Sequence, residues 1–195
     1  MSDSSLSQAK AQVESIVEMV AALNCDYDRL SELQEERQAL DALIEDLAGG
    51  LVDAVSDPDS GAKLNHLKSE LDEAKEERKE WEENYLEELN ELLDAAGECE
   101  NTEDAERRID EDPLSVRVRS GWVSNPSEME AKEFEILLCT GGPAVRIVGD
   151  LDRGQPENPR IEHQDWFEPW TRFTDTTQEQ DEAILSYCQH FYFGD

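Results

Sequence analysis

The chain has 195 residues, of which 49 are Asp or Glu and 17 are Lys or Arg, and its formal net charge is −32. Such a negative surface repels the phosphates of nucleic acids and of anionic lipids, because affinity for phosphate requires Lys and Arg side chains that displace counterions. A hydrophobic fraction of 37%, with four Trp, argues against a wholly disordered chain, and neither a signal peptide nor an apolar run of about 18 residues indicates export or a membrane span.

The first half of the chain has the residue spacing of long helices. From Leu6 onwards, apolar residues recur at alternating steps of three and four, which is typical of a coiled-coil stripe. This pattern predicts either one helix over residues 5–48 or two helices that separate near Asn24. Gly49 and Gly50 predict the end of the helix, because glycine is common just after a helix.

A second long helix is predicted over residues 62–96, after a segment at residues 56–61 that has the composition of a turn. Two long amphipathic helices with a short connection favour an antiparallel helical hairpin. Neither helix can bury its apolar stripe alone, so we expect the hairpin to pack on the rest of the chain or to form a homodimer. We therefore assign residues 1–100 to an acidic, coiled-coil-like hairpin arm.

The second half of the chain changes to the alternation of β-strands, with turn residues between the runs. A short helix is predicted over residues 102–109 and a last helix over residues 177–191. Strands are predicted over residues 115–122, 133–139, 144–151 and 160–165. Because short turns join these strands, we expect an antiparallel sheet. Residues 101–195 are assigned to a small domain, and the chain to the α+β class, with a long helical hairpin before a sheet domain that has a terminal helix.

The negative charge is densest in the second predicted helix. Residues 1–100 hold 28 acidic and 8 basic residues, against 21 and 9 in residues 101–195. At about 3.6 residues per turn, seven glutamates of this helix fall within an arc of about 120° that lies nearly opposite its apolar stripe. They are Glu73, Glu76, Glu77, Glu80, Glu83, Glu87 and Glu91. Several are four residues apart, a spacing of like charges that opposes helix formation by roughly 0.2–0.5 kcal/mol per pair.

Two interpretations of this acidic face stay open. Carboxylates about 6 Å apart along the helix would offer a ladder of negative charge to a groove built for DNA or RNA, in which one strand rises about 3.4 Å per nucleotide. The face would then bind a basic nucleic-acid-binding protein or complex by mimicry, with no direct contact to nucleic acid. Alternatively, it is the solvated face of a Glu-rich amphipathic helix, which is common.

No arrangement of residues predicts catalysis. His163 lies close to Asp165 in the sequence, but no motif of a nucleophile with glycines accompanies it, and a Cys139–His163 pair rests on no motif. The segments 57–61 and 150–154 are similar to fragments of calcium loops but lack the full loop pattern. The four cysteines are far apart in the sequence, which predicts free thiols in a reducing compartment. We expect a binding protein that is not an enzyme and has no cofactor or metal.

Eight aromatic residues gather in the last thirty positions of the chain. Aromatic residues at this density either seal the core of a small domain or form an anchor patch for a partner protein. The residues are Trp166, Phe167, Trp170, Phe173, Tyr187, Phe191, Tyr192 and Phe193.

Four strings in the second half carry a family resemblance. They are residues 111–122 (EDPLSVRVRSGW), 134–147 (FEILLCTGGPAVRI), 164–170 (QDWFEPW) and 191–194 (FYFG). Through these strings, residues 105–195 resemble a family of uncharacterised proteins from bacteriophages and other mobile elements. The resemblance implies no catalytic residues, and it implies that the protein acts in the cytoplasm of a bacterial host.

Small acidic proteins of that origin include anti-CRISPR and anti-restriction proteins. By analogy, the resemblance implies an inhibitor of a host nucleic-acid-binding defence complex, which acts by stoichiometric binding through the seven glutamates. The alternative is an interaction or assembly adaptor whose coiled coil binds partners without mimicry. Its binding would depend on Leu67, Leu71 and Trp81 and would resist salt.

Overall fold

A computed structural model describes residues 3–56, 61–125, 127 and 129–194. Over these residues the fold is α+β, as predicted, with five helices and a five-stranded antiparallel sheet. The helices are α1 (Asp3–Leu23), α2 (Tyr27–Val55), α3 (Gly61–Ala96), α4 (Thr102–Glu111) and α5 (Gln178–Gln189). The strands are β1 (Ser115–Ser120), β2 (Ala131–Cys139), β3 (Ala144–Asp152), β4 (Gln155–Gln164) and β5 (Thr171–Arg172). The chain divides into two compact units, Met1–Asn24 with Gly97–Asp195 and Cys25–Ala96.

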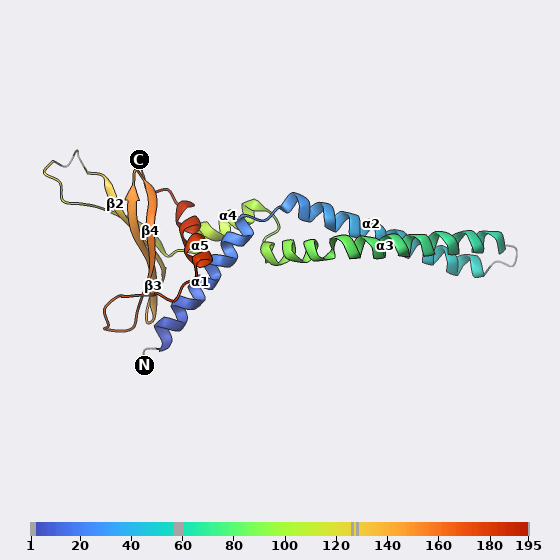
Figure 1. Ribbon diagram of the computed structural model, residues 1–195, viewed down its shortest axis with the longest axis horizontal. Coiled ribbons are helices and arrows are strands. Elements are labelled where there is room, and N and C mark those ends of the chain that lie inside the picture. Colours follow the sequence, from blue (N-terminus) through green and yellow to red (C-terminus); the bar gives the residue numbers. More distant parts are fainter. Residues whose placement is uncertain (1–2, 57–60, 126, 128, 195) are drawn as a thin grey trace. The chain divides into compact units, whose positions relative to one another are not determined.

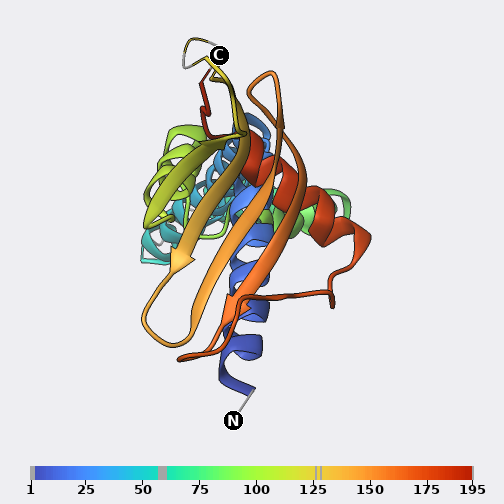
Figure 2. The ribbon, with the colours of Figure 1, turned by 90° about the vertical axis from the view of Figure 1, so that its left-hand side faces the viewer.

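The sheet of the first unit is an antiparallel meander in the order β1-β2-β3-β4-β5 (Figure 2). Because side chains alternate along a strand, β2 has two different faces. Its Phe134 and Ile136 are buried, whereas Glu133 and Glu135 lie on the other face. The register places Ile136 opposite Ile147 of β3, which is also buried. One face of the sheet therefore builds the core, and the other carries charge.

Helices α1 and α5 pack on the buried face of the sheet (Figure 2). Helix α5 begins with a capping box, in which the Thr177 hydroxyl accepts a hydrogen bond from the Gln180 N–H and the Gln180 side chain accepts one from the Thr177 N–H. Its Ile184 and Cys188 are buried in the core. From α1 the core takes a stripe spaced by three and four residues, which consists of Ala9, Val13, Ile16, Met19 and Val20.

Helix α1 belongs to the unit that contains the sheet, which differs from the predicted division into residues 1–100 and 101–195. The helix ends at Leu23 and α2 begins at Tyr27, so of the two interpretations the pair of separate helices is confirmed. The physical reason is the sheet. Its apolar face needs a cover, and Ile16 is 0% exposed there. A helical period shows that a stripe is buried, but not on which surface it packs.

Helices α2 and α3 form an antiparallel hairpin, which is the second unit (Figure 1). Asp26 caps the start of α2, because its side chain accepts a hydrogen bond from the Arg29 backbone N–H at 3.0 Å. The small core between the two helices consists of Leu30, Leu33, Trp81, Leu89 and Ala96. The structure therefore has the expected hairpin, built from α2 and α3 without α1.

Several boundaries differ from the predicted ones. Helix α2 continues through Gly49 and Gly50, neither of which has a positive φ, so the predicted end there is wrong. Strand β4 begins at Gln155 rather than near residue 160, although its first half contains two prolines. Proline is tolerated there because β5 pairs only with the far end of β4. Most of the predicted turn at residues 56–61 lies outside the described residues.

Candidate functional site

The seven glutamates of the predicted acidic face are all exposed along α3. Residues of the same helix that are buried, among them Ala74, Trp81 and Leu89, pack against α2. The exposed set is Glu73, Glu76, Glu77, Glu80, Glu83, Glu87 and Glu91. The hairpin thus leaves their carboxylates to solvent, and their role in binding stays a prediction.

Lys79 is the cation that pairs with this set among the described residues. Its Nζ lies 3.1 Å from Glu76 Oε1 and 3.9 Å from Glu83 Oε1. The hydrogen bond to Glu76 is the main cause that raises the pKa of Lys79, so the ammonium is charged at neutral pH. The face therefore presents seven carboxylates and one ammonium. No ion pair with a described residue involves Glu73, Glu77, Glu80, Glu87 or Glu91.

Other carboxylates of the hairpin hold its two helices together. Arg29 Nε donates to Glu88 Oε1 at 2.8 Å, and this hydrogen bond lowers the pKa of Glu88 and raises that of Arg29. Arg78, which interrupts the apolar stripe in the sequence, donates to Asp41 of α2 at 2.7 Å and lies 2.8 Å from Glu82. These carboxylates are structural, and the helical period does not distinguish them from the carboxylates that have no ion pair with a described residue. The available signal was the arginine itself, because a cation within an apolar stripe needs an acidic partner nearby.

The structure brings Ser5 into contact with His163 and Asp165, which are close together in the sequence. The Ser5 hydroxyl donates to Asp165 Oδ2 at 3.0 Å, and its oxygen lies 2.9 Å from His163 Nδ1. Ser5 is only 3% exposed, so a substrate cannot reach its hydroxyl. The three side chains therefore anchor the start of α1 to the end of β4. This arrangement contains a hydroxyl, an imidazole and a carboxylate, but it is a packing contact.

Cys139 does not have the environment of a nucleophile either. Burial raises the pKa of the Cys139 thiol, so the neutral form predominates at neutral pH. The carboxylate of Asp112 near this thiol is also partly buried. It accepts a hydrogen bond from the Tyr187 hydroxyl at 2.6 Å, and its desolvation raises the pKa of Asp112. All four cysteines are free, as predicted from their spacing.

The eight aromatic residues divide into buried and exposed sets. Phe173, Tyr187 and Phe193 are buried in the core. Trp166 and Phe167 are 65% and 99% exposed and lie in the segment between β4 and β5. The Trp166 ring approaches the backbone of the β2–β3 turn so closely at Gly142 that a Cβ there would overlap it. Sequence alone could not separate these sets, because both have the same composition. Of the remaining three, Tyr192 is exposed, and Trp170 and Phe191 are partly buried.

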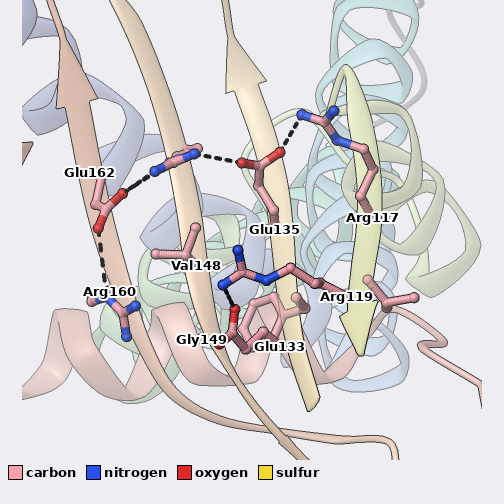
Figure 3. Close-up of a pocket in the computed structure, with 11 residues that line it drawn as sticks. Arg117, Arg119, Glu133, Glu135, Val148, Gly149, Arg160 and Glu162 are labelled. Carbon is pink, nitrogen blue, oxygen red and sulfur yellow. Dashed lines mark hydrogen bonds and ion pairs between the residues drawn. The ribbon is translucent and has the colours of Figure 1, made fainter. Parts of the chain in front are cut away.

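The outer face of the sheet carries a row of ion pairs that crosses the strands (Figure 3). Arg117 of β1 pairs with Glu135 of β2. Arg146 of β3 pairs with Glu135 at 2.7 Å and with Glu162 of β4 at 2.6 Å. The Glu162 side chain also lies 3.6 Å from Arg160. Acidic and basic residues therefore alternate from strand to strand across the sheet.

A shallow hollow of about 420 Å³ lies over this row of ion pairs (Figure 3). Arg119 of β1 and Glu133 of β2 form a further ion pair beside it. Four arginines and three glutamates line the hollow. Alternation along β1 places its two arginines on one face, but only the register between strands determines which side chains pair.

No cluster of three or more metal-ligating side chains occurs among the described residues. Of the two segments similar to calcium loops, residues 57–60 lie outside the described part, and residues 150–154 form the end of β3 and its turn to β4. None of the helices that the structure describes has the length and apolarity needed to span a membrane.

Comparison of the chain with protein-family models, with curated proteins and with solved structures gave no match. The resemblance to the bacteriophage family therefore stays a prediction from the strings that carry it.

Proposed function

We propose that this protein is a stoichiometric inhibitor of a nucleic-acid-binding defence complex of a bacterial host, in which the carboxylates of α3 take the places of phosphates. The observation that carries the proposal is the exposure of all seven glutamates on one helix, with Lys79 as the cation paired to them. The phage or mobile-element context rests on the sequence resemblance. In this role the protein acts in the host cytoplasm, by binding, with neither catalysis nor a cofactor.

The spacing of the carboxylates fits a phosphate-binding groove. Glu73 and Glu91 are 18 positions apart, which corresponds to about 27 Å along a helix. One DNA strand places about eight phosphates over that length. The hairpin as a whole, residues 25–96, holds 23 acidic and 7 basic residues, a net charge of −16. A basic groove would therefore meet both a line of charges and a strong long-range attraction.

The proposal is tested by removing charge without removing the helix. In the test variant all seven glutamates of the set become Gln, which has a similar helix propensity. The control variant makes the same change in charge outside the hairpin, at exposed residues without ion pairs to described residues. These are Glu98, Glu106, Glu111, Asp152, Glu157, Glu168 and Asp175. Each protein is used to capture partners from bacterial lysate at low and at high salt, with DNA or RNA as competitor.

Mimicry predicts that the wild type and the control variant retain a basic nucleic-acid-binding complex, that salt or competing nucleic acid releases it, and that the seven-Gln variant loses it. Equal loss in both variants would mean that only the net charge matters. Retention by the seven-Gln variant would refute the role of this face.

A coiled-coil adaptor is the second candidate, and one observation favours it. Near the end of α2 the apolar side chains of Leu43, Val52 and Val55 are 44%, 70% and 68% exposed. Trp81, by contrast, is 7% exposed within the hairpin core, so it is not available to a partner in this state. An adaptor predicts salt-resistant binding that is lost when Val52 and Val55 become Ser. The seven-Gln variant would keep that binding.

A further inference from the structure

Strand β1 is an open edge of the sheet. It is the first strand in the order β1-β2-β3-β4-β5, so it pairs with β2 on one side only. An edge strand leaves alternate backbone N–H and C=O groups without a strand partner. At the opposite edge, β5 is only two residues long and pairs only with the far end of β4. The first half of β4 contains two prolines, which have no N–H to donate to an added strand.

The inner face of β1 is apolar but poorly covered. Val116 and Val118 lie opposite Ile136 and Phe134 of β2, so all four side chains point to the same side of the sheet. Ile136 and Phe134 are 0% and 3% exposed, whereas Val116 and Val118 are 37% and 50% exposed. The helices that cover the centre of the sheet therefore leave its β1 edge partly uncovered. Apolar side chains of an added strand would bury these two valines.

The outer face of β1 has a defined electrostatic preference. Arg146, between two strands, pairs with one glutamate on each neighbour, Glu135 of β2 and Glu162 of β4. Arg117 and Arg119 of β1 pair with β2 through Glu135 and Glu133, and β1 has no strand on its other side (Figure 3). Both arginines are largely exposed, at 64% and 76% of their side-chain area. By the pattern that Arg146 shows, the next member of each row is an acidic residue.

We propose that β1 binds an extended segment of a partner protein in which acidic and apolar residues alternate, as an added edge strand. The acidic residues would pair with Arg117 and Arg119, and the apolar residues would cover Val116 and Val118. Strand β2 already has this pattern, with Glu133 and Glu135 alternating with Phe134 and Ile136, and it occupies the other side of β1. A second copy of β1 fits less well. If two β1 strands pair antiparallel with their arginines on the same side of the sheet, arginine comes to lie opposite arginine. This surface is separate from the acidic face of α3.

The probe is a synthetic peptide with the sequence of residues 131–137, labelled with a fluorophore, and a control peptide in which both glutamates are lysines. Binding to the full-length protein is followed by fluorescence anisotropy, and hydrogen exchange of the backbone amides locates the site. The proposal predicts binding of the acidic peptide only, with slower exchange along β1. The R117Q/R119Q variant should bind it about tenfold more weakly, because two exposed cross-strand ion pairs are lost.

The matched control is R153Q/R172Q, which removes two exposed arginines away from β1 and should leave the affinity unchanged. Equal binding of the lysine peptide, equal weakening by both variants, or protection that maps outside β1 would overturn the proposal. The absence of any binding would also overturn the proposal, because the arginines would then be charges that prevent other strands from pairing with β1. Self-association that depends on Val118 would assign the edge to a second copy instead.

Discussion

Replacing Gly49 and Gly50 of α2 with alanine tests the course of the hairpin, because the two descriptions of this segment predict effects of opposite sign. If the helix continues to Val55, each Gly→Ala change stabilises it by about 1 kcal/mol through helix propensity. If a glycine instead ended the helix in the left-handed region, alanine there would cost about 1 kcal/mol. The structure gives neither residue a positive φ.

The two positions also differ in their surroundings. A Cβ at Gly50 would lie 3.8 Å from both Leu67 Cδ atoms, an ordinary van der Waals contact with α3, whereas a Cβ at Gly49 would have no neighbour within 4 Å. Gly50→Ala should therefore stabilise α2 by about 1.3 kcal/mol in total. Of this, about 1 kcal/mol comes from helix propensity, and a few tenths of a kcal/mol come from burial of the new methyl group. Gly49→Ala should stabilise α2 through helix propensity alone, by about 1 kcal/mol.

The assay is hydrogen exchange of the α2 amides, because two units need not unfold in one transition. Both variants should raise the free energy of local opening of α2, and Gly50→Ala should raise it at least as much as Gly49→Ala. Faster exchange in either variant would refute the continuous helix. A smaller gain for Gly50→Ala than for Gly49→Ala would refute its packing against Leu67.

Two further predictions concern the unit that contains the sheet. Desolvation raises the pKa of Asp112 above its value in the unfolded chain, so the folded state binds this proton more tightly. The proton therefore contributes to the free energy of unfolding at acid pH. That contribution is lost as the pH rises through the raised pKa. Asp112→Asn keeps an acceptor for the Tyr187 hydroxyl. In urea unfolding, the stability of the variant relative to the wild type should therefore increase as the pH rises towards neutral. A difference that does not depend on pH would contradict this. Ser5→Ala removes the contacts to Asp165 and His163 and should destabilise the protein by about 1–2 kcal/mol in the same assay. The exposed Ser7→Ala is its control, and equal effects would show that Ser5 is no anchor.

The parts of the fold that could be predicted are those set by local periodicity. Alternation along residues 133–139 identified β2, since Phe134, Ile136 and Leu138 face the core. The spacing in the first 23 residues identified α1, but not its surface. Leu6, a member of the predicted stripe, is 45% exposed, while Ser5 is buried because it bonds to the end of β4. The partner of a stripe is a long-range property that no local pattern contains.

Pairing between residues that are distant in the sequence is what the sequence alone does not predict. The glutamates of α3 could be placed on one face from the helical period alone, because the angle between them depends only on their spacing. The row that joins Arg117 to Glu135 and Arg146 could not, because it depends on the register of three strands. For the same reason, the carboxylates that bind Arg29 and Arg78 across the hairpin could not be told from the free ones.

The two proposed surfaces differ in what holds their partners, and salt separates them. The α3 face offers exposed carboxylates, so its binding depends on displaced counterions and should weaken steeply as salt rises. The β1 edge offers backbone hydrogen bonds and two half-exposed valines besides its arginines, Arg117 and Arg119. Backbone pairing and apolar burial persist when charges are screened. A partner of β1 should therefore lose only the part of its affinity that the two ion pairs contribute. Because the two surfaces lie in different units, one salt titration with both sets of variants assigns a partner to either of them.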